Sequence, residues 1–302
     1  MAKQLMIAKT AEEAVSLKGQ RSAFLAGGTE INRLGTSCDA SRLIGIGRVP
    51  TLDGIDEYMD AEKGTNYIRI GAMSTFQDII ESPLIPAYLK EACRFMGSRT
   101  KRNMATIGGN IALRRTDSYL YATLLACHAK LDLMCKDGAV IRKCTRAYLE
   151  DYKTYSDMLI VSVLVPVDAV VASKRYANTV QSHAVLTVSA GLTEGKLRVA
   201  VAAKDTYLGM LPEGELPFKD DLPREVLVFP MEELGEGDAE RAREDPARGR
   251  KSRRPAEKPR QEEAKEGVLR RSFVGRWEIR NRLVRMWRHG RSARDSQERR
   301  RF

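Results

Sequence analysis

The sequence has 302 residues, five cysteines and a formal net charge of +11. Residues 241–302 hold 22 Lys and Arg against 9 Asp and Glu, whereas residues 1–240 hold 29 against 31, so a polyanion-binding role would concern the C-terminal part alone. No apolar run reaches the about 18 residues of a transmembrane helix, no secretory signal is expected, and five cysteines without a C-x-x-C pair favour reduced thiols over a disulfide framework or an iron–sulfur cluster in this chain.

The first predicted elements are short strands and helices. A helix is expected over 11–19, strands over 22–25, 42–46 and 66–72, and a second helix over 87–96. Ser74 and Gln77 have the spacing of a capping box, which predicts a helix from there through Ile80. A polar, basic loop is expected over 98–103, and Asp117 or Ser118 is expected to cap a helix through about residue 127.

Two hairpins are predicted further along the chain. Asp137-Gly138 separates strands over 131–135 and 139–143, and Glu194-Gly195 separates strands over 186–192 and 196–203. A nearly continuous apolar strand is expected over 158–165. Helices and strands do not alternate strictly, so the pattern favours an α+β fold over a doubly wound sheet.

Two glycine pairs are the most informative local feature. Gly27-Gly28 follows an apolar strand, and Gly108-Gly109 lies in a predicted loop. Without a Cβ the backbone can approach a ligand closely, and two such loops can offer N–H donors to one diphosphate, with Thr29, Thr106 and Asn110 adding side-chain donors. An ordinary turn remains the alternative for each pair. The sequence has neither the G-x-G-x-x-G of a Rossmann site nor a P-loop motif.

Other chemically interesting residues have simpler interpretations. Lys101 and Arg102 would either neutralise a diphosphate or form a solvated basic loop. His128 and His183 have no partner at metal-ligand spacing, so no metal-binding residue is expected. No Ser/His/Asp order or paired carboxylates predict a catalytic residue, and Cys93 and Cys127 are expected in the core.

Four ordered motifs resemble one family. They are A-G-G-T-E at 26–30, I-R-I-G-A-M-S-T at 68–75, E-S-P-L-I-P at 81–86 and R-N-M-A-T-I-G-G-N-I-A at 102–112. Together they resemble the FAD-binding subunits of molybdenum hydroxylases, which include xanthine dehydrogenase and carbon monoxide dehydrogenase flavoprotein chains. The resemblance covers about residues 1–205, and S-R-x-x-R-N at 98–103 is most similar to the separate FAD subunits of bacterial xanthine-dehydrogenase-type enzymes.

The resemblance implies a fold and a set of site residues. The fold is a two-lobed α+β FAD-binding domain of the vanillyl-alcohol oxidase type over 1–167, a partial small α+β domain over 168–210, and a divergent, low-order Arg-rich tail over 211–302. Strand 158–165 would pass near the flavin ring. The residues implied at the FAD diphosphate are Phe24, Leu25, Ala26, Gly27, Gly28, Thr29, Glu30, Ile31, Thr106, Ile107, Gly108, Gly109 and Asn110. The resemblance also implies that the region near Asp117 would correspond to an acidic residue of the family that contacts the cofactor.

The resemblance also implies a function. The chain would be a cytoplasmic electron-transfer flavoprotein subunit, which receives electrons from [2Fe–2S] clusters on a small partner subunit and passes them to an acceptor such as NAD. Substrate would be hydroxylated on a molybdopterin-binding large subunit. Alone, the chain is not expected to act on the organic substrate.

The sequence departs from the family in two places. Residues 176–183 contain no Lys or Arg, where the family has a basic residue, so a flavin contact from the second domain is not expected. Residues 206–302 do not resemble the family's compact helical end and are a divergent extension or a frame-shifted reading. Two alternative functions follow: a degenerate member without FAD, or nucleic-acid binding through the Arg-rich tail with Trp277 and Trp287.

Overall fold

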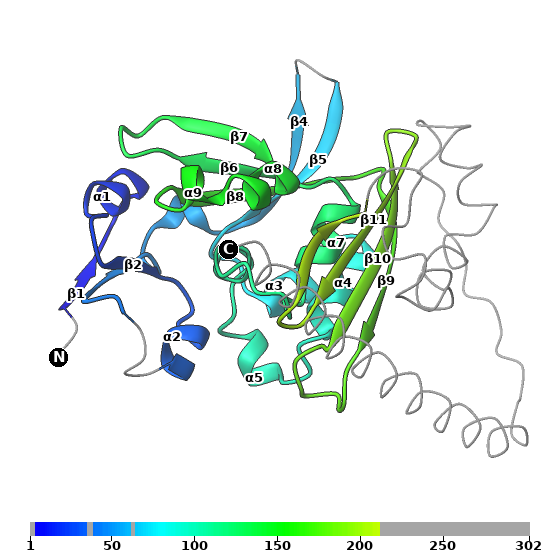
Figure 1. The fold of residues 1–302 in the computed structure, drawn as a ribbon. Helices are drawn as coiled ribbons and strands as arrows, with labels where there is room; N and C mark the ends of the chain where they lie inside the picture. The colour runs from blue at the N-terminus through cyan, green and yellow to red at the C-terminus, as the bar shows by residue number, and fades with distance from the viewer. Residues whose placement is uncertain (1–3, 35–38, 62–63, 212–302) are drawn as a thin grey trace, which may run out of the picture. The chain divides into compact units, whose positions relative to one another are not determined.

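Three β-sheets organise the residues that this computed structural model describes, which are 4–34, 39–61 and 64–211 (Figure 1). The predicted Arg-rich tail lies outside the described residues, apart from Leu211. The described helices are α1 (Ala11–Ser16), α2 (Thr29–Leu34), α3 (Phe76–Glu81), α4 (Ala87–Arg94), α5 (Arg99–Arg102), α6 (Ile107–Ala112), α7 (Tyr121–Ala126), α8 (Thr145–Glu150) and α9 (Tyr152–Tyr155), with a 3-10 turn at Pro50–Leu52. Among these residues, none of the helices has the length and apolar character needed to span a bilayer.

The first sheet is parallel and small. Its strands are β1 (Gln4–Ile7), β3 (Arg42–Gly45) and β2 (Ser22–Leu25), in that order. Thr10 is the N-cap of α1, and its side chain accepts a hydrogen bond from the Glu13 N–H. Helix α1 contacts β6 (Lys130–Met134) and β8 (Leu159–Pro166), and a small buried cluster joins its Ala14 and Val15 to Ile44 of the parallel sheet and to Met134 and Leu159. This small core therefore links the first sheet to the second, five-stranded sheet.

The second sheet is antiparallel and carries the main core. Its order is β4 (Ile55–Asp60), β5 (Thr65–Gly71), β8 (Leu159–Pro166), β6 (Lys130–Met134) and β7 (Val140–Cys144). Alternate side chains on its strands point into the core, and each of them is at most 4% exposed: Ile68, Ile70, Leu131, Leu133 and Val163. Helices α3, α4, α6 and α7 contribute the other side of this core.

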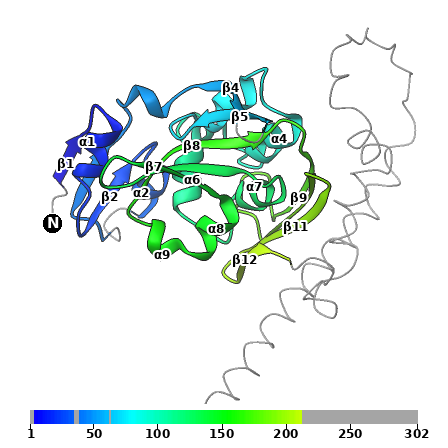
Figure 2. The ribbon, with the colours of Figure 1, turned by 90° about the horizontal axis from the view of Figure 1, so that it is seen from above.

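The third sheet is built from β12 (Tyr207–Met210), β11 (Lys196–Ala203), β10 (Leu186–Thr193) and β9 (Val170–Tyr176), all antiparallel. Helix α7 contacts each of its strands, and Figure 2 shows α7 between β8 and this sheet. All six residues of α7 are buried, and the Thr123 hydroxyl lies 2.9 Å from the Ser173 hydroxyl of β9. One buried helix thus joins the two larger sheets.

Most of the predicted elements are present, and the α+β class is confirmed. Both hairpins form at the predicted turns. Glu194 and Gly195 both have the positive φ that a two-residue turn requires, whereas in the first hairpin only Gly138 does, and the Cys135 N–H donates to the Ala139 carbonyl, so that turn contains three residues rather than two. The capping box was predicted one residue too early: Thr75 and Asp78 form it, and the helix ends at Glu81.

Other elements were missed at the sequence level. The predicted loops contain three short helices, α2, α5 and α6, and the strands β1, β4, β9 and β12 were not predicted. Leu120, rather than Asp117 or Ser118, is the N-cap of α7, although the Ser118 hydroxyl accepts from the Tyr121 N–H. Cys93 and Cys127 are completely buried, as expected.

Gly191 is required where β10 crosses α7, because a Cβ there would overlap the carbonyl oxygen of Ala126. We predict that Gly191→Ala lowers the free energy of unfolding by about 1–3 kcal/mol, since neither backbone can move away freely. The matched control is Gly19→Ala, where a Cβ meets no atom within 4 Å. Urea unfolding followed by circular dichroism measures both, and equal stability of the two variants would contradict this packing.

Candidate functional site

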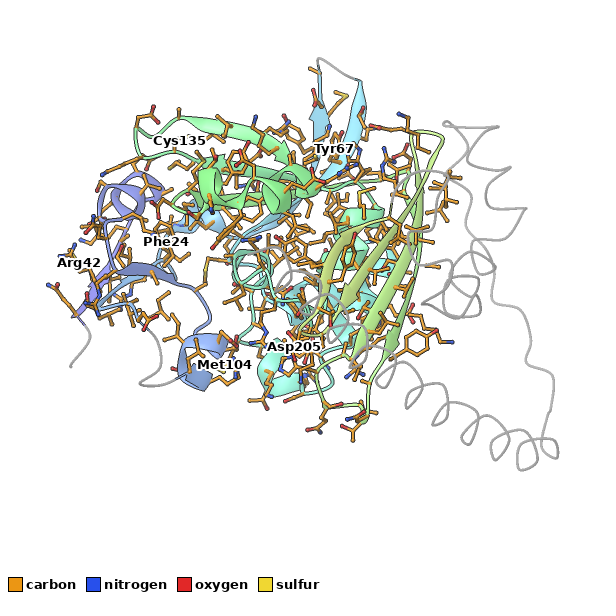
Figure 3. All side chains as sticks on the ribbon, in the orientation of Figure 1. Phe24, Arg42, Tyr67, Met104, Cys135 and Asp205 are labelled. Atoms are coloured by element: carbon orange, nitrogen blue, oxygen red, sulfur yellow. The ribbon has the colours of Figure 1, made fainter. Side chains whose placement is uncertain are left out.

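The two glycine pairs lie in direct contact, although they are far apart in the sequence. A Cβ on Gly27 would overlap the carbonyl oxygen of Met104, which begins the second glycine segment, and Figure 3 marks Met104 next to α2. A Cβ on Gly109 would lie 3.8 Å from the Cβ of Ala26. The absence of side chains therefore lets the backbones of the two segments touch.

The first glycine segment runs from the end of β2 into α2. Gly28 has φ of +70°, a conformation that favours glycine, and its carbonyl accepts the Asn32 N–H that closes the first helical turn. The N–H groups of Thr29, Glu30 and Ile31 belong to this first turn, where a helix provides no acceptor for them. Residues 24–31 are half-buried, so this turn presents backbone donors close to the surface.

The second glycine segment differs from its prediction as a loop, because Gly108 and Gly109 form the first turn of α6. Thr106 is the N-cap, and its hydroxyl oxygen accepts the Gly109 N–H at 3.1 Å. The Ile107 N–H donates to the Ser74 carbonyl at 3.1 Å, and the Gly108 N–H donates to the Ala72 carbonyl at 2.9 Å. These amides hold α6 against the connection between β5 and α3, so the N–H donors expected for a ligand here are already bonded within the protein.

The packing of Gly108 supports the same interpretation. A Cβ on Gly108 would lie 2.7 Å from the Cβ of Ala72, too close for any real pair of carbon atoms. The polar group that α6 still offers is the Asn110 side chain, which is half-buried. Its Oδ1 accepts a hydrogen bond from the Ser118 hydroxyl at 2.8 Å, which leaves the amide nitrogen as a donor.

An ionic network lies next to both segments. The Arg115 guanidinium donates from Nε and Nη2 to the two oxygens of Asp117, both at 2.7 Å, and from Nη1 to Glu30 Oε1 at 2.7 Å. Glu30 also accepts a hydrogen bond from Arg33 Nε at 2.9 Å. The Asp117 side chain is only 4% exposed and that of Glu30 is 15% exposed, so both carboxylates are largely desolvated.

The network keeps its carboxylates ionised. Hydrogen bonds from Arg33 and the charge of Arg115 lower the pKa of Glu30, and together they outweigh its partial burial. Burial alone would raise the pKa of Asp117, but the hydrogen bonds and charge of Arg115 hold it below its ordinary value. The hydrogen bond to Asp117 raises the pKa of Arg115 in turn.

A histidine from the third sheet reaches the same place. His183 lies in the connection between β9 and β10, with Nδ1 3.4 Å from Asp117 Oδ2 and its ring 5.3 Å from that of Tyr119. Burial lowers the pKa of His183, against the opposing effect of Asp117. Burial therefore favours the neutral form of His183, and the positive charges of the network are those of Arg33 and Arg115.

Several residues singled out in the sequence have structural roles. Arg102 donates to Gln77 Oε1 at 3.0 Å and to the Met96 carbonyl at 2.8 Å, which ties α5 to α3 and α4. Lys101 is exposed. Phe24 packs against the small core beside the first sheet. The described residues contain no group of three His, Cys, Asp or Glu side chains that could hold a metal ion.

Sequence reasoning did not find Arg115. The signal was present in R-R-T-D at 114–117, a basic pair that directly follows α6 and precedes the acidic residue. Two hollows lie on the surface: one is lined by residues of β4, β6 and β7, and the other by residues of α8 and β12 together with Arg114 and Thr116, which flank Arg115. Neither includes a residue of the glycine segments.

The sequence matches the family described as FAD binding domain in molybdopterin dehydrogenase over residues 1–168. It is 35% identical over 134 residues to the uncharacterized protein YgfM of Escherichia coli K12, a match that covers 43% of this chain and 49% of that protein. It is 37% identical over 112 residues to the carbon monoxide dehydrogenase medium chain of Hydrogenophaga pseudoflava (34% of this chain, 37% of that one). It is 37% identical over 115 residues to the nicotinate dehydrogenase FAD-subunit of Eubacterium barkeri (34% and 36%). The chain therefore spans about half the length, or less, of the curated relatives it matches.

The fold is similar to solved structures. Carbon monoxide dehydrogenase from Hydrogenophaga pseudoflava matches with a TM-score of 0.60 and 22% identity, over 70% of this chain and 77% of the matched chain. Quinoline 2-oxidoreductase from Pseudomonas putida 86 matches with a TM-score of 0.58 and 18% identity, over 67% and 74%. With the family match, this confirms the expected α+β FAD-binding-domain fold.

Gly27 tests the contact between the two segments. We predict that Gly27→Ala destabilises the FAD-free protein by about 1–3 kcal/mol, because the new methyl group overlaps the Met104 carbonyl. Gly47→Ala is the matched control, since a Cβ there meets only the end of Met73 at 4.0 Å. Thermal unfolding of both variants measures the effect, and an unchanged melting temperature for Gly27→Ala would show that the segments do not touch. If a larger residue at position 27 or 108 abolished ligand binding, the cause would be disrupted packing rather than a lost contact with the ligand.

The lowered pKa values of Glu30 and Asp117 predict acid sensitivity. In the unfolded chain the pKa of these carboxyl groups is about 4. The network therefore stabilises the fold fully above that pH, and its contribution is lost as the pH falls through the lower folded pKa values. The free energy of unfolding should fall less steeply between about pH 5 and 3 in the Glu30→Gln/Asp117→Asn double variant than in the wild type. Urea titrations across this range measure it, and parallel curves would contradict the network.

Proposed function

The chain belongs to the family of FAD-binding domains in molybdopterin dehydrogenases, and from this premise we propose that it is the FAD-carrying, electron-relaying part of a molybdenum hydroxylase. The family membership rests on the match over residues 1–168. FAD is accordingly the cofactor of this family, and the named relatives include an FAD-subunit and a dehydrogenase medium chain.

The observation that supports the proposal is the backbone contact between the two glycine segments. Gly27 against the Met104 carbonyl, and Gly109 beside Ala26, bring the start of α2 and the start of α6 together. The first turn of α2 offers N–H donors, and Asn110 offers its amide. Backbone N–H groups and a neutral amide donor fit a diphosphate, whose oxygens accept hydrogen bonds without offering any.

The roles of the individual residues follow from these contacts. We assign the diphosphate to the turn over 26–31 and to the Asn110 amide. Thr106, Ile107, Gly108 and Gly109 hold the second segment in place through their own hydrogen bonds and packing. Asp117, which is bonded through both oxygens to Arg115, acts on the site through that arginine. FAD held there would supply the redox chemistry, while the chain supplies position and electrostatics.

The finer parts of the proposal rest on the sequence resemblance and the relatives' names. We propose a molybdopterin-binding large subunit and a [2Fe–2S] small subunit as partners, a xanthine-dehydrogenase-like reaction, NAD as the acceptor and the cytoplasm as the location. The names medium chain and FAD-subunit, borne by two relatives, support a multi-subunit assembly. The alternative of nucleic-acid binding rests on residues 241–302, outside the described part of the chain.

The test is FAD uptake by the purified full-length chain, followed by its visible absorption and by competition with FMN. We predict a flavin spectrum and a clear preference for FAD, because FMN lacks the diphosphate. Asn110→Ala should weaken FAD binding by roughly tenfold or more, since it removes a hydrogen bond to a charged group.

The matched control is Asn66→Ala on β5, which is exposed and distant from the glycine segments in the sequence. Its FAD affinity should equal that of the wild type. Equal affinity for FMN and FAD would contradict the diphosphate assignment. A chain that takes up neither flavin would instead indicate a family member that has lost its cofactor.

A further inference from the structure

We propose that Arg115 is a positioning residue of the FAD site, which fixes the two glycine segments to each other and cancels the carboxylate charge beside the diphosphate. The inference rests on the proposed function and deepens it. Arg115 lies in the connection between α6 and α7, and its guanidinium binds Asp117 of the same connection and Glu30 of α2.

The geometry of Arg115 joins the two segments. Glu30 lies on α2, two residues after Gly28, and Asp117 lies five residues after the end of α6. One guanidinium binds both carboxylates with three hydrogen bonds of 2.7 Å. A planar, bidentate pair of this kind fixes orientation as well as distance. Arg115 therefore adds a side-chain tie to the backbone contact at Gly27.

The charges explain why the tie matters for an anionic cofactor. A diphosphate bound at the first turn of α2 would lie close to Glu30, and like charges at this range repel each other strongly in a partly desolvated site. Within the network, Glu30 and Asp117 are balanced by Arg33 and Arg115. Removing Arg115 would leave one uncompensated negative charge at the place where the diphosphate is held.

Two other basic side chains, Arg33 and His183, lie near the carboxylates, but neither replaces Arg115. Arg33 is 51% exposed, so solvent screens its charge, and its hydrogen bonds go to Glu30 rather than to Asp117. His183 faces Asp117 at 3.4 Å, but burial lowers its pKa and so disfavours its charged form. Asp117 is 4% exposed and depends on Arg115, so removing the guanidinium would leave a buried carboxylate without a counter-charge.

Arg142 provides a matched control. It makes a similar bidentate pair with Asp132, with Nε to Oδ1 at 2.7 Å and Nη2 to Oδ2 at 3.2 Å. Its side chain is 31% exposed, against 29% for Arg115. Arg142 lies on β7, and its partners Asp132, Tyr58 and Asp60 lie on β6 and β4 of the five-stranded sheet, none of which contains a residue of the glycine segments. Arg142→Met therefore measures the loss of an equivalent ion pair outside the proposed FAD site.

The experiment titrates FAD into the full-length apoprotein and follows flavin fluorescence, with apoprotein melting temperatures measured alongside. We expect Arg115→Met to weaken FAD binding at least about tenfold and Arg142→Met to leave it within about threefold of the wild type. Adding Glu30→Gln to Arg115→Met should recover most of the lost affinity, because it returns the network to its original net charge and removes the carboxylate that lies next to the α2 turn. Arg115→Lys should be intermediate, since it keeps the charge but loses the bidentate geometry.

Each contrary result has a distinct meaning. Wild-type affinity in Arg115→Met, or equal losses in Arg115→Met and Arg142→Met, would overturn the positioning role while leaving FAD binding intact. Failure of Glu30→Gln to recover affinity would overturn the charge-cancelling role. If Arg115→Met does not fold, Arg115→Met/Asp117→Asn takes its place. This variant keeps the net charge of the network and leaves no buried carboxylate unpaired, so it tests the positioning role alone: a loss of FAD affinity supports that role, and wild-type affinity would overturn it. A wild-type chain that binds no FAD would overturn the proposed function itself.

Discussion

The site depends on one steric constraint, the absence of a side chain at Gly27. Because nothing projects from this residue, the strand-to-helix turn after β2 can lie directly on the Met104 carbonyl, where α6 is about to begin. Gly108 plays the same part on the other side of α6, where it lets the helix lie against Ala72 and donate to its carbonyl. At Gly27 the turn after β2 therefore packs directly on the second glycine segment. At Gly108 that segment packs directly on the end of β5 in the five-stranded sheet. In this chain, packing alone is enough to require glycine at positions 27 and 108.

The charged side chains beside the glycine segments form the second requirement of the site. The contact brings Glu30 and Asp117, two largely desolvated carboxylates, beside a turn that we assign to a dianionic group, which would be unfavourable without compensation. Arg115 meets both carboxylates at once, and His183 extends the contacts to the third sheet through Asp117. The same residue therefore serves both the geometry and the charge of the site. This explains how a cradle with few cations of its own could hold an anionic cofactor.

The parts of the fold that depend on local signals could be predicted from the sequence, and those that depend on distant contacts could not. The turns at Asp137-Gly138 and Glu194-Gly195 were predicted because their conformational requirement is local. Gly108-Gly109 was predicted as a loop because glycine disfavours helices, yet contact with Ala72 selects a helix there. The pair Arg115–Glu30 spans 85 residues, so no spacing rule could reveal it. The family motifs indicated where the site lies, whereas the roles of its individual residues could be inferred only from the structure.

Amide hydrogen exchange of the full-length chain, compared with and without FAD, tests the central claim most directly. The account predicts that FAD slows exchange in two separate stretches, residues 26–32 and residues 104–112, with the larger change in the first, because the α6 amides are already bonded within the protein. Exchange at the β6–β7 hairpin should not change. Protection confined to one stretch, or found only away from both, would contradict a cofactor site built from the contact between the two glycine segments.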